Sequence, residues 1–199
     1  MHVSFNKLLL GFVLLLEGTF ASPLIAKRMP KDLSKKVFLG YRAIDSRTAA
    51  SYDRKHRLVY THTTFDQLGQ GAYLTRRLGD WTADYVCAVY ADATQLALTK
   101  KLWLDHDERE SPVREQVIKT QLNMKERNIH KVILTSGIWG KDDRESHVQM
   151  LIPPSLLANT NKDSSGKLGI YVICVPWESQ TELPTNEEAD WSSLGIVRY

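Results

Sequence analysis

The sequence predicts a single α+β domain in which short strands and helices follow one another without strict alternation. Short runs of β-branched and aromatic residues recur along the 199-residue chain. The helices expected from capping and periodicity lie mostly in its first half. Because strands and helices do not alternate regularly, a doubly wound parallel sheet is not expected.

The first half of the chain is expected to begin with a strand and a helix. Residues 37–42 form an apolar run that predicts the strand. Asp45 or Ser46 caps a helix that extends to about residue 56. The residues expected on its inner side are Ala49, Ala50 and Tyr52. Residues 58–64 are expected to be extended, and Gly69 and Gly71 break the chain before residues 72–75. The other elements expected here are a short helix at 81–85, a strand at 86–90 and a helix at 94–103.

The second half is expected to contain one longer helix, three strands and a tail. Pro112 occupies a first-turn position, so a helix is expected from there to about residue 127. Its partial apolar stripe consists of Val113, Val117, Ile118 and Leu122. Strands are expected at 132–135, 148–152 and 170–175. The acidic tail, residues 178–199, could pack on the domain through Trp191 and Ile196.

The first 21 residues have the organisation of a secretory signal peptide. Lys7 precedes an apolar run at residues 8–16, and small residues follow up to Ala21. The run is about half as long as a membrane span. We expect cleavage after Ala21 and a secreted, extracellular chain without a membrane anchor. The alternative is a short signal anchor.

Residues 22–36 form a polar, basic arm. It contains Lys27 and Arg28, a dibasic pair that resembles the sites cut by Golgi subtilisin-like proteases. Cleavage after Arg28 would leave residues 29–199. The alternative is an uncut pair in a flexible arm.

Cys87 and Cys174 are the two cysteines of the chain, and each lies in a strand-like run. In an oxidising compartment an even cysteine count favours one disulfide, which here would close a long loop. The alternative is two separate buried thiols that pack as small apolar side chains.

The charges are too evenly balanced to indicate a nucleic-acid partner. The chain carries 26 Lys and Arg against 23 Asp and Glu, and its basic pairs are scattered rather than gathered in a stripe. His106 lies among acidic residues at 105–108, but their spacing matches no calcium loop, so no metal is expected. The chain contains no Walker loop, Gly-x-Ser-x-Gly elbow or His-Glu-x-x-His motif.

Three short motifs, far apart in the chain, stand out from this background. Tyr41-Arg42 ends the first expected strand, residues 71–75 read Gly-Ala-Tyr-Leu-Thr, and residues 147–154 read His-Val-Gln-Met-Leu-Ile-Pro-Pro. An aromatic-arginine pair, a pocket tyrosine and a strand-borne Glu-x-Glu mark the ADP-ribosyltransferases. The sequence resembles this family, and most closely small secreted fungal proteins that look like its members.

The resemblance implies an ADP-ribosyltransferase-like domain over residues 37–177, with mixed or antiparallel sheets and flanking helices. NAD is the cofactor that it implies. Arg42 matches the arginine that holds the phosphate side of NAD, since a guanidinium bonds phosphate oxygens bidentately. Tyr73 matches the tyrosine that stacks on nicotinamide, and Thr61 or Thr75 would supply a hydroxyl. The cofactor-binding positions carried over are Tyr41, Arg42, Thr61, Gly71, Tyr73 and Thr75.

The sequence departs from the family at the catalytic positions. Gln149 falls at the catalytic glutamate, and His147 falls at the first glutamate of the pair. A carboxylate there stabilises the charge that grows on the ribose as nicotinamide leaves, and losing such a group costs a factor of about 10²–10³ in rate. A carboxamide is neutral, although it can still hydrogen-bond a hydroxyl. Glu145 would share a strand face with both residues.

Functions of different classes follow from these residues. The missing glutamate favours a monomeric, virulence-type effector that binds an unknown host or competitor protein and has a degenerate NAD pocket. One alternative is an active NAD-dependent mono-ADP-ribosyltransferase toxin. Another is an unrelated secreted interaction domain. The effector and the toxin hypotheses both require Arg42, Tyr73 and Gln149 to line one cleft.

Overall fold

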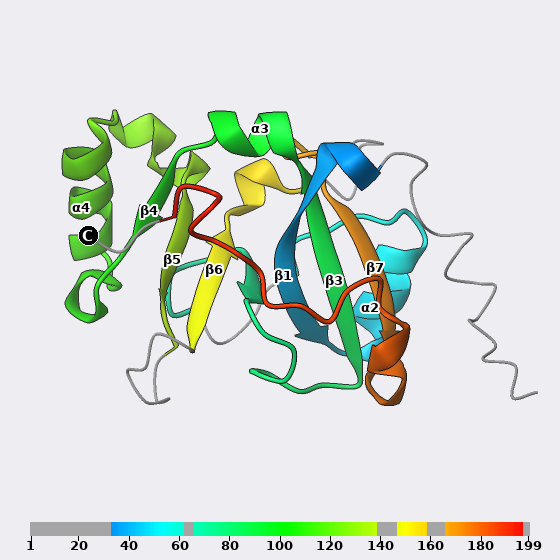
Figure 1. Ribbon diagram of the computed structural model, residues 1–199. Helices are drawn as coiled ribbons and strands as arrows, with labels where there is room; N and C mark the ends of the chain where they lie inside the picture. Colours follow the sequence, from blue (N-terminus) through cyan, green and yellow to red (C-terminus); the bar gives the residue numbers. More distant parts are fainter. Residues whose placement is uncertain (1–32, 62–65, 139–146, 159–165, 197–199) are drawn as a thin grey trace, which may run out of the picture.

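The chain folds around one mixed β-sheet. The computed structural model describes residues 33–61, 66–138, 147–158 and 166–196, and within these ranges the sheet has seven strands in the order β4-β5-β6-β2-β1-β3-β7 (Figure 1). Among these strands, only β4 and β5 pair in parallel. The predicted α+β class is therefore confirmed. The predicted signal peptide and dibasic site lie outside the described residues.

The strands and helices have the following bounds. The strands are β1 (Lys36–Ile44), β2 (Ala72–Thr75), β3 (Tyr85–Asp92), β4 (Lys101–Trp103), β5 (Ile133–Gly137), β6 (Val148–Ile152) and β7 (Tyr171–Pro176). The α-helices are α2 (Ser46–Asp53), α3 (Ala93–Leu98) and α4 (Val113–Leu122). Short 3-10 helices are η1 (Leu33–Lys35), η2 (His106–Glu108), η3 (Glu126–Lys131), η4 (Pro154–Leu156) and η5 (Trp177–Glu182). The strands predicted at 37–42, 86–90, 132–135, 148–152 and 170–175 correspond to β1, β3, β5, β6 and β7. Strand β2 was not predicted.

Helix α2 begins where its cap predicts. The carboxylate of Asp45 accepts hydrogen bonds from the Thr48 amide at 2.9 Å and the Thr48 hydroxyl at 2.7 Å. Ala49 and Tyr52 are buried as predicted, whereas Ala50 is exposed. Residues three apart share a helix face, and a neighbour in sequence is turned well away from it.

Two of the elements predicted in the first half differ in the structure. The helix predicted at 94–103 ends at Leu98, because the residues of β4 pair with β5 instead. The described part of residues 58–64 is not a strand, and it contributes an isolated parallel bridge between Val59 and Ala158.

Two other helix predictions are also corrected. The helix predicted to reach residue 127 ends at Leu122, since Asn123 adopts a left-handed conformation (φ 48°) that terminates helices. Residues 81–85 were expected to be helical. They form a loop, and Tyr85 already pairs as the first residue of β3.

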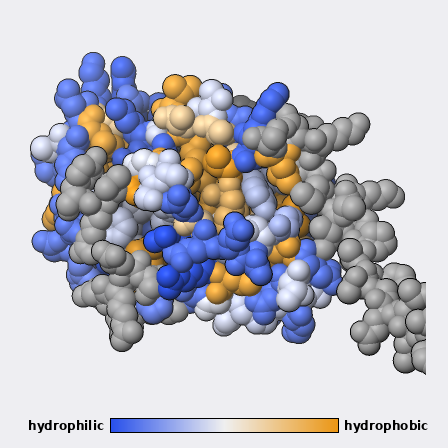
Figure 2. Space-filling view, viewed as in Figure 1, coloured by the Kyte–Doolittle hydropathy of each residue, from blue (hydrophilic) through white to orange (hydrophobic). Residues whose placement is uncertain are grey.

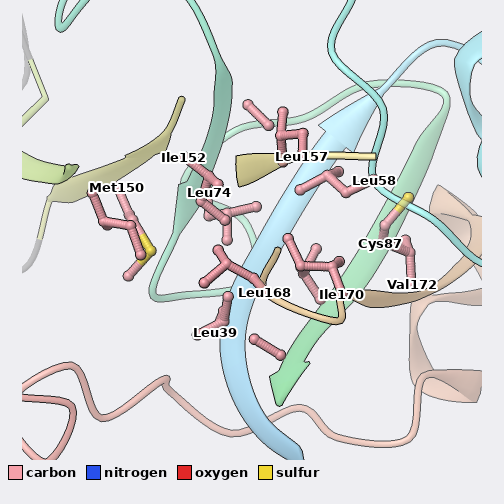
Figure 3. Packing of buried hydrophobic residues seen from close by; sticks show 14 of the residues in the cluster. Leu39, Leu58, Leu74, Cys87, Met150, Ile152, Leu157, Leu168, Ile170 and Val172 are labelled. Atoms are coloured by element: carbon pink, nitrogen blue, oxygen red, sulfur yellow. The ribbon is translucent and has the colours of Figure 1, made fainter. Parts of the chain in front are cut away.

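The sheet buries apolar side chains on both faces. One face carries a large cluster, to which α2 contributes Ala49 and Tyr52 (Figure 3). On the other face α4 packs its Ile118 against Leu134 and Leu151. The labelled residues of Figure 3 are Leu39, Leu58, Leu74, Cys87, Met150, Ile152, Leu157, Leu168, Ile170 and Val172. Hydrophilic residues surround an apolar band on the side shown in Figure 2. No helix of the described residues has the length and apolarity needed to cross a membrane.

Residues 183–196 cross the sheet as a strap (Figure 1). The Tyr41 hydroxyl donates to the Glu187 carbonyl at 2.9 Å. The Trp191 indole N–H donates to the Leu39 carbonyl at 2.6 Å. Trp191 is 3% exposed and Ile196 is buried, so the packing predicted for these two residues is confirmed. The strap is therefore part of the folded unit.

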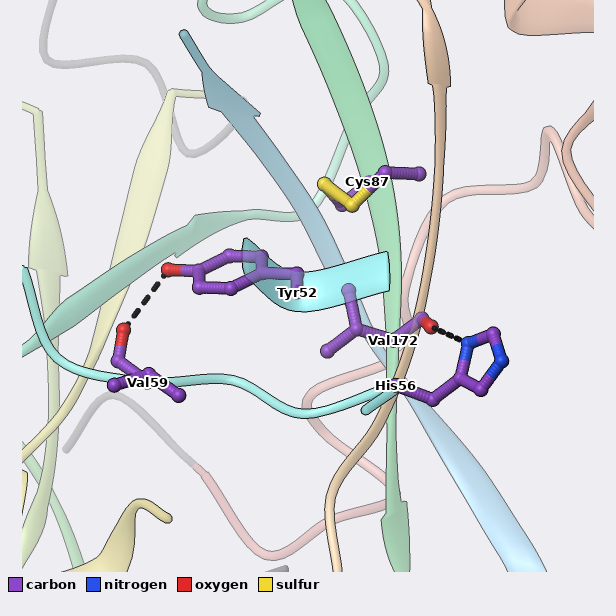
Figure 4. The surroundings of a disulfide bond; sticks show 6 residues. Tyr52, His56, Val59, Cys87 and Val172 are labelled. Carbon is purple, nitrogen blue, oxygen red and sulfur yellow. Dashed lines mark hydrogen bonds between the residues drawn. A yellow bond between two sulfur atoms is a disulfide. The ribbon is translucent and has the colours of Figure 1, made fainter. Parts of the chain in front are cut away.

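A disulfide joins two neighbouring strands. Cys87 on β3 and Cys174 on β7 are paired directly in the sheet and form the predicted bridge, so the prediction is confirmed. Both residues are buried, and Tyr52 of α2 lies close to the bridge (Figure 4). The Tyr52 hydroxyl donates to the Val59 carbonyl at 3.0 Å, which ties the chain after α2 to this region.

Replacing both cysteines, Cys87→Ala with Cys174→Ala, should lower the free energy of unfolding by about 3–4 kcal/mol, because the bridge restricts a loop of 87 residues in the unfolded chain. Urea unfolding of the two proteins measures the difference. An unchanged unfolding midpoint would contradict the role assigned to the bridge.

Trp191→Phe should lower the free energy of unfolding by about 1–2 kcal/mol, because the buried Leu39 carbonyl loses its donor. Leu98→Ala is the matched control, since Leu98 is 77% exposed and should leave stability unchanged. Thermal unfolding compares the variants. Equal midpoints for both would show that the strap does not stabilise the domain.

Candidate functional site

The strands that carry the three sequence motifs lie side by side, in the order β6-β2-β1. The register places Tyr41 opposite Thr75, Thr75 opposite Gln149, and Gln149 opposite Ser136 of β5. Residues paired directly across strands project from the same face, so these four form one row. Tyr73 is two residues from Thr75 and lies on the same face.

Arg42 projects from the opposite face of the sheet. It is paired with Cys87, and Cys87 is paired with Cys174, so its side chain leaves on the side of the disulfide. Arg42 is only 6% exposed. Its Nη1 donates to the backbone carbonyl of Tyr73 at 2.9 Å. Arg42 and Tyr73 are therefore linked through the backbone, while the side chains of Arg42 and Gln149 lie on opposite sides of the sheet.

The contact between β1 and β2 explains this use of Arg42. Within these two strands the ladder has a single register pair, Tyr41 with Thr75. A Cβ at Gly40, where φ is +135°, would lie 2.3 Å from the Thr75 carbonyl oxygen, so the close approach requires glycine. Next to the pair of Tyr41 and Thr75, the Arg42 guanidinium donates to the Tyr73 carbonyl of β2. A buried carbonyl needs such a partner. The Arg42 Nε has no hydrogen-bond partner in the described part of the chain.

Tyr73 holds a neighbouring loop. Its hydroxyl accepts a hydrogen bond from the Leu68 amide at 2.8 Å and donates one to the Gly69 carbonyl at 2.7 Å. Burial raises the pKa of Tyr73 to about 12, so the hydroxyl is protonated at neutral pH. Its ring packs in the cluster formed with Leu134 and Leu151.

Gln149 is fully buried, with an exposed fraction of 0%. Its Nε2 donates to the Gln67 Oε1 at 2.5 Å and to the Gly137 carbonyl at 3.2 Å. These bonds fix the carboxamide against β5 and against the segment that precedes β2. Its Oε1 has no hydrogen-bond partner within the described ranges.

A buried arginine lies next to this row. Arg109 is 5% exposed, and its Nε donates to the Ser136 hydroxyl at 2.6 Å. Ser136 donates in turn to the Leu104 carbonyl at 2.7 Å. Sequence reasoning missed Arg109, Ser136 and Gln67. The one available signal was the polar end of the otherwise apolar run 132–136.

The remaining predicted residues lie around the row. The Thr75 hydroxyl donates to the Arg77 carbonyl at 3.1 Å. His147 directly precedes β6, and its ring Nδ1 is buried without a partner among described residues. Thr61 lies in the loop after α2, outside the three strands. Gly71 precedes β2, where a Cβ would lie 2.4 Å from the Ile152 carbonyl oxygen. Glu145 lies outside the described residues.

Two cavities are bounded by described residues. One, of about 440 Å³, borders the row: it is lined by residues of α4, η3 and the segments 68–70 and 153–155, together with Leu134 of β5 and Leu151 of β6. The other, of about 520 Å³, lies where β1 and β7 begin. Neither of these two is lined by Arg42, Tyr73 or Gln149, so neither is the common cleft that the resemblance requires. Across the described ranges, no three His, Cys, Asp or Glu residues are grouped so that they could hold a metal ion.

The fold and the site define a disulfide-linked α+β protein whose central strands carry a row of buried polar side chains. The chain belongs to DUF5910, a family of unknown function, which matches residues 66–198. The matched segment begins after β1 and α2, so Tyr41 and Arg42 lie outside it. No curated protein matches the chain.

Tyr73→Phe should lower the free energy of unfolding by about 1–3 kcal/mol, because the Leu68 amide and the Gly69 carbonyl both lose a partner. Tyr60→Phe is the matched control. The Tyr60 hydroxyl is buried without a partner in the described chain, so its removal should cost nothing. Urea unfolding measures both variants, and equal stabilities would contradict the role of Tyr73.

Proposed function

We propose that this member of DUF5910 is a secreted, effector-type protein with an ADP-ribosyltransferase-like arrangement of strands, and that it acts by binding. Its target is a host or competitor protein. The NAD pocket that the resemblance implies is degenerate, because Arg42 and Gln149 leave the sheet on opposite sides. We infer that the chain does not transfer ADP-ribose.

The adjacency of β1, β2 and β6 supports the likeness to ADP-ribosyltransferases. The residues that matched the family's motifs are dispersed over more than a hundred positions, and five of them, Tyr41, Arg42, Tyr73, Thr75 and Gln149, fall on three neighbouring strands. Three of these, Tyr41, Thr75 and Gln149, occupy one register row. Thr61, Gly71 and His147 lie outside the strands.

The environment of Gln149 is the main support for the proposal that the chain does not transfer ADP-ribose. The reaction needs a negative charge beside the ribose as nicotinamide leaves. At this position the chain has a neutral carboxamide that is fully buried, and its N–H groups already bond Gln67 and Gly137. The side chain therefore serves the packing of β5, β6 and the preceding loop.

The placement of Arg42 supports the same conclusion. An arginine that clamps a diphosphate must present its guanidinium to the ligand. In this chain the guanidinium is buried on the disulfide face and bonds the Tyr73 carbonyl. The two groups on which NAD chemistry would depend thus leave the sheet on opposite sides.

The disulfide supports secretion. Buried disulfides persist in oxidising compartments, and the bridge between Cys87 and Cys174 agrees with the signal peptide expected at residues 1–21. An effector that acts outside the cell that makes it would be exported by this route.

We expect the purified chain to release nicotinamide from NAD no faster than buffer alone. Gln149→Glu should behave in the same way, because a restored carboxylate still lies across the sheet from Arg42. Chromatographic detection of nicotinamide measures the rate, and circular dichroism checks that each protein is folded.

Gln149→Leu serves as the reference protein, since it removes the carboxamide while keeping a similar volume. Catalytic release by the wild type that is lost in Gln149→Leu would overturn the proposal and identify an active enzyme. Release by Gln149→Glu alone would show that the pocket is complete except for its carboxylate.

A further inference from the structure

The cavity of about 520 Å³ is assembled from segments that are far apart in the sequence. Lys36 begins β1 and is paired with Asp92, which ends β3. Tyr171 begins β7, beside Tyr90 of β3. Residues 55–57 after α2 and residues 166–170 before β7 complete the wall. Its size lies within the range of small-molecule sites, about 300–1,000 Å³.

The wall of this cavity is strongly basic. Among the described residues of the wall, four are cationic and one is an acid, and His56 adds an imidazole ring. The cationic residues are Lys36, Lys55, Arg57 and Lys167. The acid, Asp92, accepts a hydrogen bond from the Gln95 amide at 2.9 Å as the cap of α3. The lining has a formal excess of three positive charges, and the whole chain also carries +3. Outside this lining, basic and acidic residues are therefore equal in number in the sequence.

Backbone geometry holds the basic groups around the cavity. His56 (φ 49°), Gly166 (φ 74°) and Gly169 (φ 56°) all adopt left-handed conformations in the two loops of the wall. The Lys36 ammonium donates to the Gly169 carbonyl at 2.8 Å. A Cβ at Gly169 would lie 3.2 Å from the Asp92 Cβ, so a larger residue would disturb this side of the wall.

The ring of His56 is also fixed. It stacks on Tyr171 with centroids 4.8 Å apart, and its Nδ1 lies 3.3 Å from the Val172 carbonyl oxygen (Figure 4). The Val172 amide donates to the His56 carbonyl at 3.1 Å. Because a carbonyl accepts, Nδ1 carries the hydrogen in this bond, and Nε2 is the ring nitrogen left for a ligand.

We propose that this cavity binds a small ligand with clustered phosphate groups, either a free polyphosphorylated metabolite or the phosphorylated headgroup of a lipid. A concave wall with several Lys and Arg residues suits clustered phosphates, which accept charge-assisted hydrogen bonds from many donors. Nucleic acid would require an extended basic stripe, and the charges outside the cavity balance. This site is separate from the Gln149 row and does not depend on the proposed function.

Inositol hexakisphosphate is the soluble probe, titrated calorimetrically into the purified chain. We expect one binding site whose affinity falls as salt is added, because the attraction is ionic. Lys55→Glu with Lys167→Glu, two exposed positions on the wall, should weaken binding by about tenfold or more.

Lys125→Glu with Arg127→Glu is the matched control. Both positions are exposed, neither lines the cavity, and the change in net charge is the same. The control should bind as the wild type does. Equal affinity of the cavity variant and the control would overturn the proposal, because binding would then follow net charge alone. Absence of any binding would also overturn it.

Vesicles of phosphatidylcholine with phosphatidylinositol phosphates distinguish the two sources of ligand. Sedimentation with these vesicles, reversed by inositol hexakisphosphate and lost in the cavity variant, assigns the site to a lipid headgroup. Binding of the soluble probe without sedimentation assigns it to a free metabolite. The nicotinamide assay reports on the Gln149 row, so failure of one proposal leaves the other standing.

Discussion

The sheet depends on a very short junction between β1 and β2. A single register pair, Tyr41 with Thr75, joins the half formed by β4, β5, β6 and β2 to the half formed by β1, β3 and β7. Gly40 permits the close approach, and Arg42 supplies the next hydrogen bond across the junction. A buried guanidinium at such a place is a structural group, since removing it would leave a buried carbonyl of β2 unpaired.

Other long-range links reinforce the same junction. The strap bonds β1 through Tyr41 and Leu39. It also bonds Arg76, just after β2: the Ala189 amide donates to the Arg76 carbonyl, and the Arg76 Nε donates to the Ala189 carbonyl. Glu188 forms ion pairs with Arg76 and Arg77 at 2.8 and 2.9 Å. Glu188 thus pairs with both arginines after β2, while the disulfide joins β3 to β7. The buried cluster that contains Leu39, Leu74 and Met150 also spans both halves of the sheet, and the strap adds to this contact.

Polar chemistry in the protein divides between two environments. In the row of Gln149, buried polar groups bond one another and hold strands in register, as buried polar groups must when water is excluded. At the start of β1 and β7, cationic groups surround an open cavity. The burial of a polar residue near the centre of the fold therefore does not indicate a function. The basic cavity at the start of β1 and β7 is the stronger candidate for a binding site.

Local patterns in the chain were sufficient to place β1, β3, β5, β6 and β7, the cap of α2, the disulfide partners and the packing of Trp191. Each of these follows from side-chain type and short-range spacing. Tertiary structure alone decided that residues 72–75 and 101–103 join the sheet, because strand pairing outweighs local propensity. It likewise decided that residues 81–84 form a loop. It also decided which face Arg42 occupies and which segments form the basic cavity. Alternation fixes the faces within one strand, but the register between strands depends on partners that are distant in the chain.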